Sequence, residues 1–357
     1  MHSHLDSSQI LESVLFRHLS LPAPGVSYFL SCQRFSVKGK PYIKDTRHRE
    51  VSVPQMKRDS VTAGDQEWVF INDEFLRVEN AKVSVFDHGF LYGDGVFESM
   101  VAFNSKIFRL DDHVDRLFAS ALAIALQIPL SKERIKDAIL CTVRKNQLKD
   151  AYVRVVVTRG QGYPVLDPRI PERPTVVVLT YKQELPPVVA KTYHSREAGI
   201  RAVVASTRKT PPVSLDSRIK SLNYLNNIMA RLEAINAGAD EAILMDCNNF
   251  VAEAPGANVC VVRKRTIQTP ELNNQLDGIT LNVVLNLAKK KGYFTERTNM
   301  TRYDLYTADE VFLTSTTPGI TPVSEIDGRQ IGTQRPGPVT KELAAGLREL
   351  ISTECPP

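Results

Sequence analysis

The sequence has no long hydrophobic run and few cysteines. No apolar stretch approaches the roughly 18 to 20 residues that a membrane-spanning helix requires, so we expect a soluble protein without a membrane partner. The cysteines are scattered, form no CxxC pair and have no histidine at metal-binding spacing. We therefore expect reduced thiols in a cytoplasmic compartment and no metal site. The five cysteines are Cys32, Cys141, Cys247, Cys260 and Cys355.

The sequence also has little excess charge of either sign. The net charge is +5 over 357 residues, and the basic residues are spread along the chain. Because nucleic-acid-binding proteins concentrate basic residues in one patch, nucleic acid is not an expected partner, whereas anionic small molecules are compatible with this balance. With 43% hydrophobic and 24% charged residues, the composition is that of a globular protein long enough for two packed domains.

Residues 1–62 lack the regular patterns of the rest of the chain. We predict that they form a poorly ordered N-terminal extension. Asp6 and Glu12 argue against a transit peptide, because such peptides are poor in acidic residues. Met56 is an alternative start of the chain, in which case the preceding residues have no structural role.

The regular part of the chain predicts an α/β fold with mixed sheets. Short strands alternate from Trp68 onwards, and a helical pattern begins where Asp111 or Asp112 is expected to act as the cap. A second helix is expected after Ser131. A double proline marks a linker within residues 183–190. We therefore predict a small α/β domain over residues 63–185 and a larger domain over residues 186–357.

Lys220 is the first candidate for chemistry. It lies where an extended polar segment gives way to a helical pattern, among the apolar residues Ile219, Leu222 and Leu225. A buried lysine has a lowered pKa and becomes a nucleophile for aldehydes. On local sequence alone, a solvated surface lysine is the ordinary alternative.

Further segments could serve a phosphorylated pyridine cofactor. A carboxylate such as Glu253 keeps a pyridine nitrogen protonated. The turn at Gly278, with Thr280 as a possible cap, presents the amides of Ile279 and Thr280 to a phosphate. The remaining candidates are the hydroxyls and amides of Thr316 and Thr317 at a strand end, and Arg116 on an amphipathic helix as an anion clamp. Each candidate also has an ordinary alternative: a solvated turn for Glu253, a common helix start for Gly278 and Thr280, a hydroxyl-rich loop for the threonines and a surface arginine for Arg116.

Seven segments occur in an order that resembles the motifs of the class IV (fold-type IV) aminotransferases, from about Trp68 to Leu350. They are FDHGFLYGDGVFE, DDHVDRLFASA, IKSLNYLNN, EAILMD, VAEAPGANV, LDGIT and FLTSTTPGITPVSEIDG. The resemblance implies a fold-type IV architecture with a small N-terminal α/β domain and a larger C-terminal pseudo-barrel domain. It also implies pyridoxal 5′-phosphate as the cofactor and a homodimer or higher homo-oligomer with the active site at a domain interface.

The resemblance assigns a role to each candidate residue. Lys220 binds the cofactor covalently and then transfers the substrate's α-proton as general base and acid. Glu253 pairs with the pyridine nitrogen, Tyr224 contacts the phenolic oxygen and Leu276 packs against the ring. Arg116, Ile279, Thr280 and Thr316 hold the phosphate, and Gly278 and Thr317 are further cofactor-binding residues. The amides of Thr316 and Thr317 also bind the substrate carboxylate.

Within this family, the sequence is most similar to the branched-chain aminotransferases. These use leucine, isoleucine or valine with 2-oxoglutarate, and Tyr92 and Phe97 would line an apolar side-chain pocket. Other family activities remain open: a D-amino acid aminotransferase first, although an Arg-x-His pattern is missing, and then an aminodeoxychorismate lyase. A non-catalytic binding module is a further alternative. The chain departs from the usual pattern at Ser99, Met100, Val101, Leu281 and Pro318.

Overall fold

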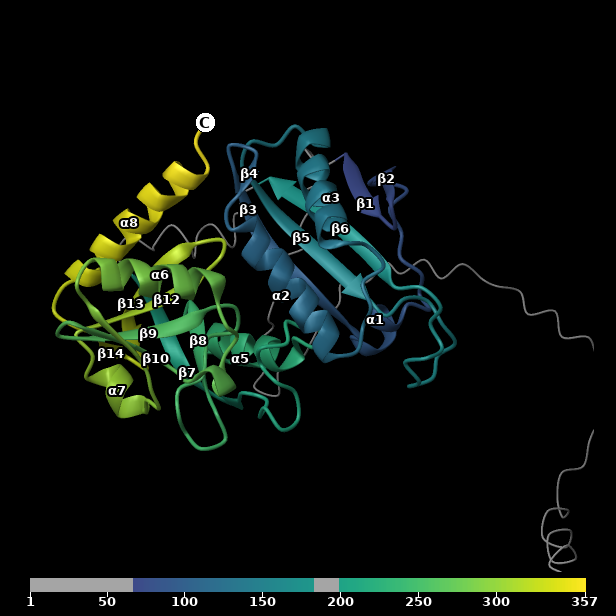
Figure 1. Ribbon diagram of the computed structural model, residues 1–357. Coiled ribbons are helices and arrows are strands. Elements are labelled where there is room, and N and C mark those ends of the chain that lie inside the picture. The colour runs from purple at the N-terminus through teal and green to yellow at the C-terminus, as the bar shows by residue number, and fades with distance from the viewer. Residues whose placement is uncertain (1–66, 183–198) are drawn as a thin grey trace, which may run out of the picture. The chain divides into compact units, whose positions relative to one another are not determined.

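The structure is a computed structural model that describes residues 67–182 and 199–357 of the chain. Within these ranges the chain forms two β-sheets with helices packed against them (Figure 1). The predicted extension over residues 1–62 and the predicted linker over residues 183–190 lie outside the described residues. In the described part of the chain, no helix has the length and apolar character needed to cross a membrane.

The first sheet has six antiparallel strands in the order β2-β1-β6-β5-β3-β4. Its strands are β1 (Trp68–Ile71), β2 (Glu74–Arg77), β3 (Gly95–Phe103), β4 (Lys106–Ile107), β5 (Ala151–Thr158) and β6 (Thr175–Lys182). Asn72 and Asp73 form the turn between β1 and β2, and both adopt the positive φ that these residue types tolerate in tight turns. The alternating pattern over residues 82–86 forms no strand, and a short helix, α1 (His88–Tyr92), follows it.

Two helices, α2 (Leu110–Ala123) and α3 (Lys132–Lys145), pack on one face of this sheet (Figure 1). Ser131 caps α3 as predicted, because its side chain accepts a hydrogen bond from the Arg134 amide. The predicted cap of α2 is wrong. Asp111 and Asp112 lie inside its first turn, after an N-cap residue without a side-chain bond. At that position they still interact favourably with the helix dipole.

The alternation of side chains along β5 separates a core face from a second face of the sheet. Val153, Val155 and Val157 belong to the cluster that packs against α2 and α3. Tyr152, Arg154 and Val156 therefore point to the opposite face, and β3 contributes Phe97, Ser99 and Val101 directly across from them. This second face carries a small hydrophobic cluster of Val69, Ile71 and Val177 with Val156 packed against it, and aromatic, polar and charged side chains beside that cluster.

The second sheet has eight strands and mixes parallel with antiparallel pairs, which confirms the predicted mixed α/β fold. Its main path runs in the order β11-β10-β9-β12-β13-β7-β8, and β14 pairs with β13. Parallel pairs join β10 to β11, β7 to β13 and β7 to β8. The strands are β7 (Ile200–Arg208), β8 (Glu241–Met245), β9 (Asn258–Arg263), β10 (Thr266–Thr269), β11 (Phe294–Arg297), β12 (Glu310–Ser315), β13 (Gly319–Ile326) and β14 (Arg329–Gln330).

Strand β9 is buried on both of its faces. Val259 and Val261 belong to one hydrophobic cluster, whereas Cys260 and Val262 belong to another that includes residues of α6 and α8. The helices of this part of the chain are α5 (Leu225–Asn236), α6 (Ile279–Lys290), α7 (Arg302–Tyr306) and α8 (Pro338–Glu354), with a 3-10 turn η3 (Leu272–Asn274). Helix α5 ends before Gly238, whose positive φ is typical of a glycine that ends a helix.

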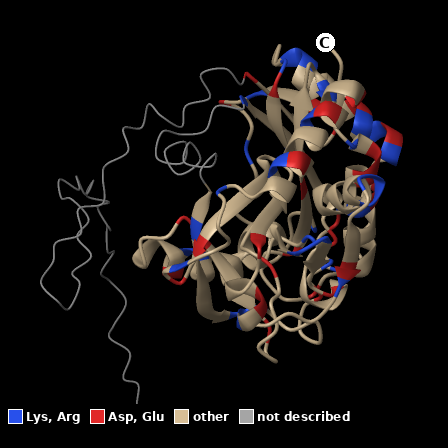
Figure 2. Cartoon of the chain, turned by 90° about the vertical axis from the view of Figure 1, so that its left-hand side faces the viewer, with Lys and Arg blue, Asp and Glu red and all other residues tan. Residues whose placement is uncertain are grey.

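The segment 219–222 follows β7, a strand of the second sheet, in sequence, yet it bonds to the first sheet. Phe97 donates its amide to the Lys220 carbonyl, and Leu222 donates to the Gly95 carbonyl. Through these bonds the loop that carries Lys220 is attached to β3 of the first sheet. The division at residues 185 and 186 stays a prediction. Figure 2 shows charges of both signs interspersed over the described residues, in keeping with the small net charge.

Candidate active site

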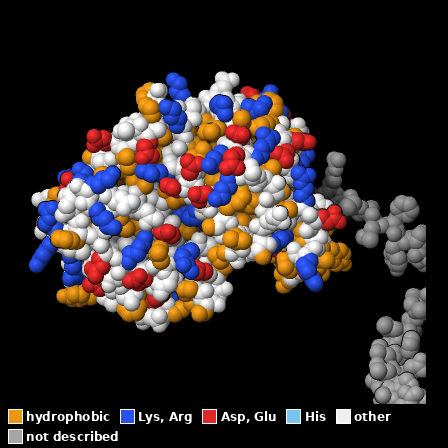
Figure 3. All heavy atoms as spheres, in the orientation of Figure 1, with side chains coloured by type: hydrophobic (Ala, Val, Ile, Leu, Met, Phe, Trp, Pro, Cys, Tyr) orange, Lys and Arg blue, Asp and Glu red, His pale blue; other side chains and the backbone are white. Residues whose placement is uncertain are grey.

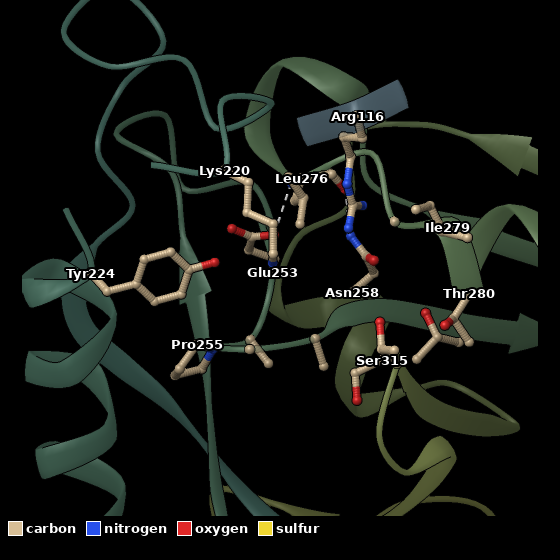
Figure 4. Close-up of a pocket in the computed structure, with 16 residues that line it drawn as sticks. Arg116, Lys220, Tyr224, Glu253, Pro255, Asn258, Leu276, Ile279, Thr280 and Ser315 are labelled. Atoms are coloured by element: carbon tan, nitrogen blue, oxygen red, sulfur yellow. Dashed lines mark hydrogen bonds between the residues drawn. The ribbon is translucent and has the colours of Figure 1, made fainter. Parts of the chain in front are cut away.

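A pocket of about 440 Å³ collects most of the predicted site residues. In Figure 4, Lys220 and Glu253 lie between Tyr224 on one side and Arg116 on the other, and Ile279 and Thr280 lie beyond Arg116. The pocket is therefore ordered along one direction. Its lining consists of Arg116, Lys220, Tyr224, Glu253, Ala254, Pro255, Gly256, Ala257, Asn258, Leu276, Gly278, Ile279, Thr280, Thr314, Ser315 and Thr316.

The backbone of Lys220 is fixed at both of its polar groups. Its amide donates to Ser120 Oγ on α2 at 3.1 Å, and its carbonyl accepts from Phe97 on β3 at 2.9 Å. Its ammonium group lies 4.7 Å from the centre of the Phe97 ring. Because α2 and β3 pack together in one hydrophobic cluster, this lysine has a defined position although it lies in a loop.

The surroundings of Lys220 favour a neutral amine. Burial lowers its pKa to about 8, with Arg116 and Arg154 acting in the same direction and Glu98 and Glu253 opposing them. A neutral amine is a nucleophile and a base, whereas an ammonium group is neither. Lys220 is partly buried, and its pKa is shifted in the direction that the sequence predicts.

Glu253 is buried and bound at both oxygens. Its Oε1 lies 2.6 Å from Lys209 Nζ, and its Oε2 accepts the Leu276 amide at 2.9 Å (Figure 4). Lys209 also reaches Asn227 Oδ1 at 3.5 Å. A buried carboxylate is stable only when it is paired, and these contacts hold Glu253 at the pocket wall beside Leu276.

Tyr224 is the N-cap residue of α5, and its side chain lines the pocket. Its ring meets the Phe97 ring edge-on, with centroids 5.1 Å apart. Burial raises the pKa of Tyr224 above its usual range, and the nearby charges of Glu253 and Glu98 add to this. The phenol therefore stays protonated at neutral pH and is a hydrogen-bond donor.

The start of α6 forms one end of the pocket. Gly278 is its N-cap and offers no side-chain bond, so the first amides of this 12-residue helix are not satisfied by a cap. The predicted cap role of Thr280 is wrong, because Thr280 lies inside the first turn. The glycine also serves close packing: a Cβ at Gly278 would lie 1.9 Å from Asn258 Oδ1. Together these features leave donors directed toward an anion.

The C-terminal residues of β12 contribute hydroxyl groups to the end of the pocket that the start of α6 forms. Thr314, Ser315 and Thr316 line the pocket, and Figure 4 shows Ser315 beside Thr280. The Thr314 hydroxyl is buried and has no hydrogen-bond partner among the described residues. Thr317 follows in the turn before β13 and lies outside the lining residues.

Arg116 projects from α2 to the pocket, and its guanidinium is shared among several groups. It donates to Glu98 through Nε at 2.6 Å and to the Asp277 carbonyl through Nη1 at 2.7 Å. Burial raises the pKa of Glu98, but the charge of Arg116 and hydrogen bonds from His113 and Arg116 outweigh it and lower the pKa to about 2. Arg116 therefore faces an ionised partner.

The predicted substrate residues differ in their placement. Phe97 contacts both Lys220 and Tyr224, so it borders the pocket. Tyr92 is the last residue of α1 and packs edge-on against His88, with centroids 5.1 Å apart. It does not line the pocket in this chain.

The second face of the six-stranded sheet continues from Phe97. The Arg154 guanidinium lies 3.9 Å from the Phe97 ring centre and, in the described part of the chain, has no hydrogen-bond or ion-pair partner. Ser99 Oγ lies 2.6 Å from the Tyr152 hydroxyl beside it. This face therefore combines an apolar surface with an arginine that has unused donors.

The departures from the family pattern have structural explanations in two cases. Leu281 is fully buried in the cluster of α6 and α8, where such a side chain contributes about 2 kcal/mol. Val101 is buried opposite Tyr152 on β5. Pro318 stands in the turn after Thr317, where nothing in the structure explains the replacement.

Sequence reasoning missed several residues at this site. Asn258 stood within a recognised motif, and an acid within an apolar strand (Glu98) or an arginine within a β-branched run (Arg154) was a signal of a special environment. Lys209 and Thr314 had no such signal, because their positions follow only from the tertiary fold. The missed residues are Glu98, His113, Arg154, Lys209, Asn258, Thr314 and Ser315.

Comparisons with known proteins give similarity over most of the chain. Residues 95–326 match the family model of amino-transferase class IV. A putative branched-chain-amino-acid aminotransferase of Methanocaldococcus jannaschii is 44% identical over 283 residues, which cover 79% of this chain and 96% of that protein. A D-alanine aminotransferase of Listeria monocytogenes is 36% identical over 292 residues, covering 80% and 97%.

A solved structure is similar in fold as well. It is the branched-chain aminotransferase of the thermophilic archaeon Thermoproteus uzoniensis with norvaline, which is 34% identical and has a TM-score of 0.74. The match covers 80% of this chain and 95% of that one. The similarity in fold therefore extends over most of the chain.

Proposed function

This chain belongs to the class IV aminotransferases, and on that premise we propose that it transfers the amino group of branched-chain L-amino acids to 2-oxoglutarate. The family and the solved relatives establish an aminotransferase with the fold-type IV architecture. The donors we propose are leucine, isoleucine and valine. The observation that carries the proposal is Lys220, an amine of lowered pKa in one pocket with Glu253 and the uncapped start of α6.

Class IV aminotransferases use pyridoxal 5′-phosphate, and the residues of this pocket fit that group. The uncapped α6 amides, the unpaired Thr314 hydroxyl and Arg116 all supply donors at one end, which suits a phosphate. Glu253 offers a carboxylate for a protonated pyridine nitrogen, and Tyr224 offers a phenol for the ring hydroxyl. The cofactor, when bound, supplies an electron sink for the substrate's α-carbon.

The residues of the chain divide the remaining work. Lys220 would hold the cofactor covalently, and its amine would move the proton at the substrate's α-carbon as general base and then acid. Glu253 keeps its negative charge toward the ring nitrogen, held in place by Lys209 and the Leu276 amide. Ile279, Thr280 and Thr316 hold the phosphate with Arg116, and Thr317 contributes its amide to the carboxylate of the substrate.

The second face of the six-stranded sheet supports the proposed substrate pair. Phe97 and Val156 give an apolar surface for a branched side chain, and they lie opposite each other on β3 and β5. Arg154 has no partner among the described residues and stacks on Phe97, so its fork is free for the second carboxylate of 2-oxoglutarate. One pocket can in this way accept an apolar donor and an acidic acceptor.

D-Alanine transamination is the second candidate, because D-alanine aminotransferases are also similar over 80% of the chain. An amino-donor panel with 2-oxoglutarate separates the two. We expect turnover of L-leucine, L-isoleucine and L-valine and little turnover of D-alanine. Turnover of D-alanine alone contradicts the proposal. Protein without a visible absorption band that borohydride removes contradicts the cofactor assignment as well.

We also propose a homodimer, supported by exposed apolar residues on one face of α5. They recur at helical spacing, and a monomer would leave this stripe in water. Figure 3 shows hydrophobic side chains interspersed with charged ones on the face it draws. The stripe consists of Leu225, Ile228, Met229, Leu232 and Ile235. Light scattering of the wild type and of L232E tests this: a dimer that L232E dissociates is expected, and a monomeric wild type contradicts it.

A further inference from the structure

Glu98 is a carboxylate in the interior of β3, with 0% of its surface exposed. Phe97, which precedes it, and Met100, the next residue on its side of the strand, are buried apolar residues. A buried charge of this kind is costly unless its partners compensate for it fully. None of the roles proposed above uses Glu98, so the function of this charge requires an explanation.

The partners of Glu98 are on α2, which packs over β3. Arg116 donates to Oε1 through Nε at 2.6 Å and to Oε2 through Nη2 at 3.0 Å. His113 Nδ1 lies 2.8 Å from Oε2, and the Ser99 amide donates to the same oxygen at 3.3 Å. His113 and Arg116 are three residues apart, so they share one face of the helix.

The protonation states of His113 and Glu98 determine which of the two donates the hydrogen bond. Burial lowers the pKa of His113 below its usual range, although Glu98 opposes the shift. A neutral His113 beside an ionised Glu98 carries its hydrogen on Nδ1 and donates it to the carboxylate. Glu98 thus accepts from both helix residues and cannot rotate without breaking bonds to each of them.

The contact with Glu98 fixes the plane of the Arg116 guanidinium. Two parallel bonds from Nε and Nη2 define the plane, and Nη1 donates to the carbonyl of Asp277, the residue before the α6 N-cap. Of the five N–H groups of an arginine, about two remain. Because Arg116 lines the pocket beside Ile279, these two are available to an anion at the start of α6.

We propose that Glu98, held by His113, is a positioning residue that orients Arg116 toward the phosphate of the cofactor. The inference rests on the proposed function, because it requires that the phosphate binds at the start of α6. It adds that β3, through one buried carboxylate, determines how tightly the phosphate is held. Glu98 itself does not touch the reacting atoms.

The test compares binding of pyridoxal 5′-phosphate with binding of pyridoxal, which lacks the phosphate, to cofactor-free protein. In E98Q the amide cannot accept from every donor around it, so Arg116 loses its fixed plane. We expect the dissociation constant for pyridoxal 5′-phosphate to rise about 10- to 100-fold, with that for pyridoxal unchanged. R116Q should show the same selective defect. E98Q/R116Q should be no worse than R116Q, because both changes remove one interaction.

Substitution of His113 gives a second arm that leaves Glu98 intact. H113N keeps an N–H donor near the position of Nδ1 and should retain the wild-type affinity, whereas H113L should weaken the binding of pyridoxal 5′-phosphate selectively. Equal weakening of both ligands, or additive effects in the double variant, overturns the inference. If the wild type binds neither ligand, the proposed function itself fails, which is a different outcome. Should E98Q not fold, the two His113 variants still decide.

Discussion

The phosphate end of the pocket and the sheet face beside Phe97, where we propose that the substrate binds, are built from different kinds of group. We call them the cofactor wall and the substrate wall. The cofactor wall, Gly278–Thr280 with Thr314–Thr316, consists of backbone amides and short hydroxyl side chains at the ends of elements. The substrate wall, Phe97, Ser99, Tyr152 and Arg154, consists of side chains that project from the middle of β3 and β5. Backbone donors persist through most substitutions, whereas projecting side chains change with each one. We infer that the reaction depends on the first wall and the choice of substrate on the second.

The comparison predicts that Lys220, which lies between the two walls, is needed for every substrate. K220A removes both the covalent link and the base, so transamination of all donors should fall by about 10⁴-fold. The phosphate donors of the cofactor wall remain, and cofactor binding should persist with lower affinity. Steady-state rates and a cofactor titration measure the two effects. K289A, at an exposed position on α6, is the matched control, and activity in K220A equal to that of the control contradicts the assignment.

A substitution of Arg154 should affect the amino acceptor, 2-oxoglutarate, much more than the amino donor, leucine. R154L removes the guanidinium group but leaves the apolar surface of Phe97. The value of kcat/KM for 2-oxoglutarate should therefore fall about 100-fold. The half-reaction with leucine should change less than about threefold, because its side chain makes no charged contact. R154K, which keeps the charge without the fork, should be intermediate. Single-turnover measurements of each half-reaction check this, and equal losses in both half-reactions exclude a role in acceptor recognition.

The same comparison explains how far the sequence predicts the site. Gly278, Thr280 and Thr316 are recognisable because they stand at the ends of elements, where glycine and hydroxyl residues have local meaning. Glu98 and Arg154 stand within strands whose pattern predicts only burial, and their roles depend on which helix or loop packs against that face. The strands and helices themselves were largely predictable from periodicity. The α2 and α6 caps were not, because an acidic or hydroxyl residue near a helix start fits several positions of its first turn.

The lowered pKa of Lys220 predicts how the empty protein reacts with the cofactor at different pH values. Its pKa is about 8 in the folded chain against 10.5 for an ordinary lysine. Below pH 8 the neutral fraction falls about tenfold per pH unit, so the rate of covalent binding should rise by that factor per unit and level off above pH 8. Stopped-flow absorbance measures it, and a flat profile between pH 6 and pH 8 contradicts the lowered pKa.

The same shift affects stability, with a defined sign. Because the folded pKa is depressed, the unfolded chain binds more protons than the folded chain between pH 8 and pH 10.5. The contribution of Lys220 to the free energy of unfolding should therefore increase as pH rises through that window. Chemical denaturation of cofactor-free wild type and K220M at several pH values isolates this contribution. R154L should move the midpoint of the rate profile upward, since Arg154 lowers the pKa of Lys220.

The smallest effect is expected at Ser99, a departure from the family pattern on the substrate wall. S99A removes the 2.6 Å contact with the Tyr152 hydroxyl and should cost about 1 kcal/mol of stability. Tyr152 would then be free to move on the face that receives the substrate, so kcat/KM values for leucine and valine should change by less than about fivefold while cofactor affinity stays constant. Y152F should reproduce the loss, and the double variant should add nothing, because both substitutions remove one hydrogen bond. A change in cofactor affinity in S99A would show that the two walls are coupled. That result would contradict the inference that cofactor binding and substrate choice depend on separate walls.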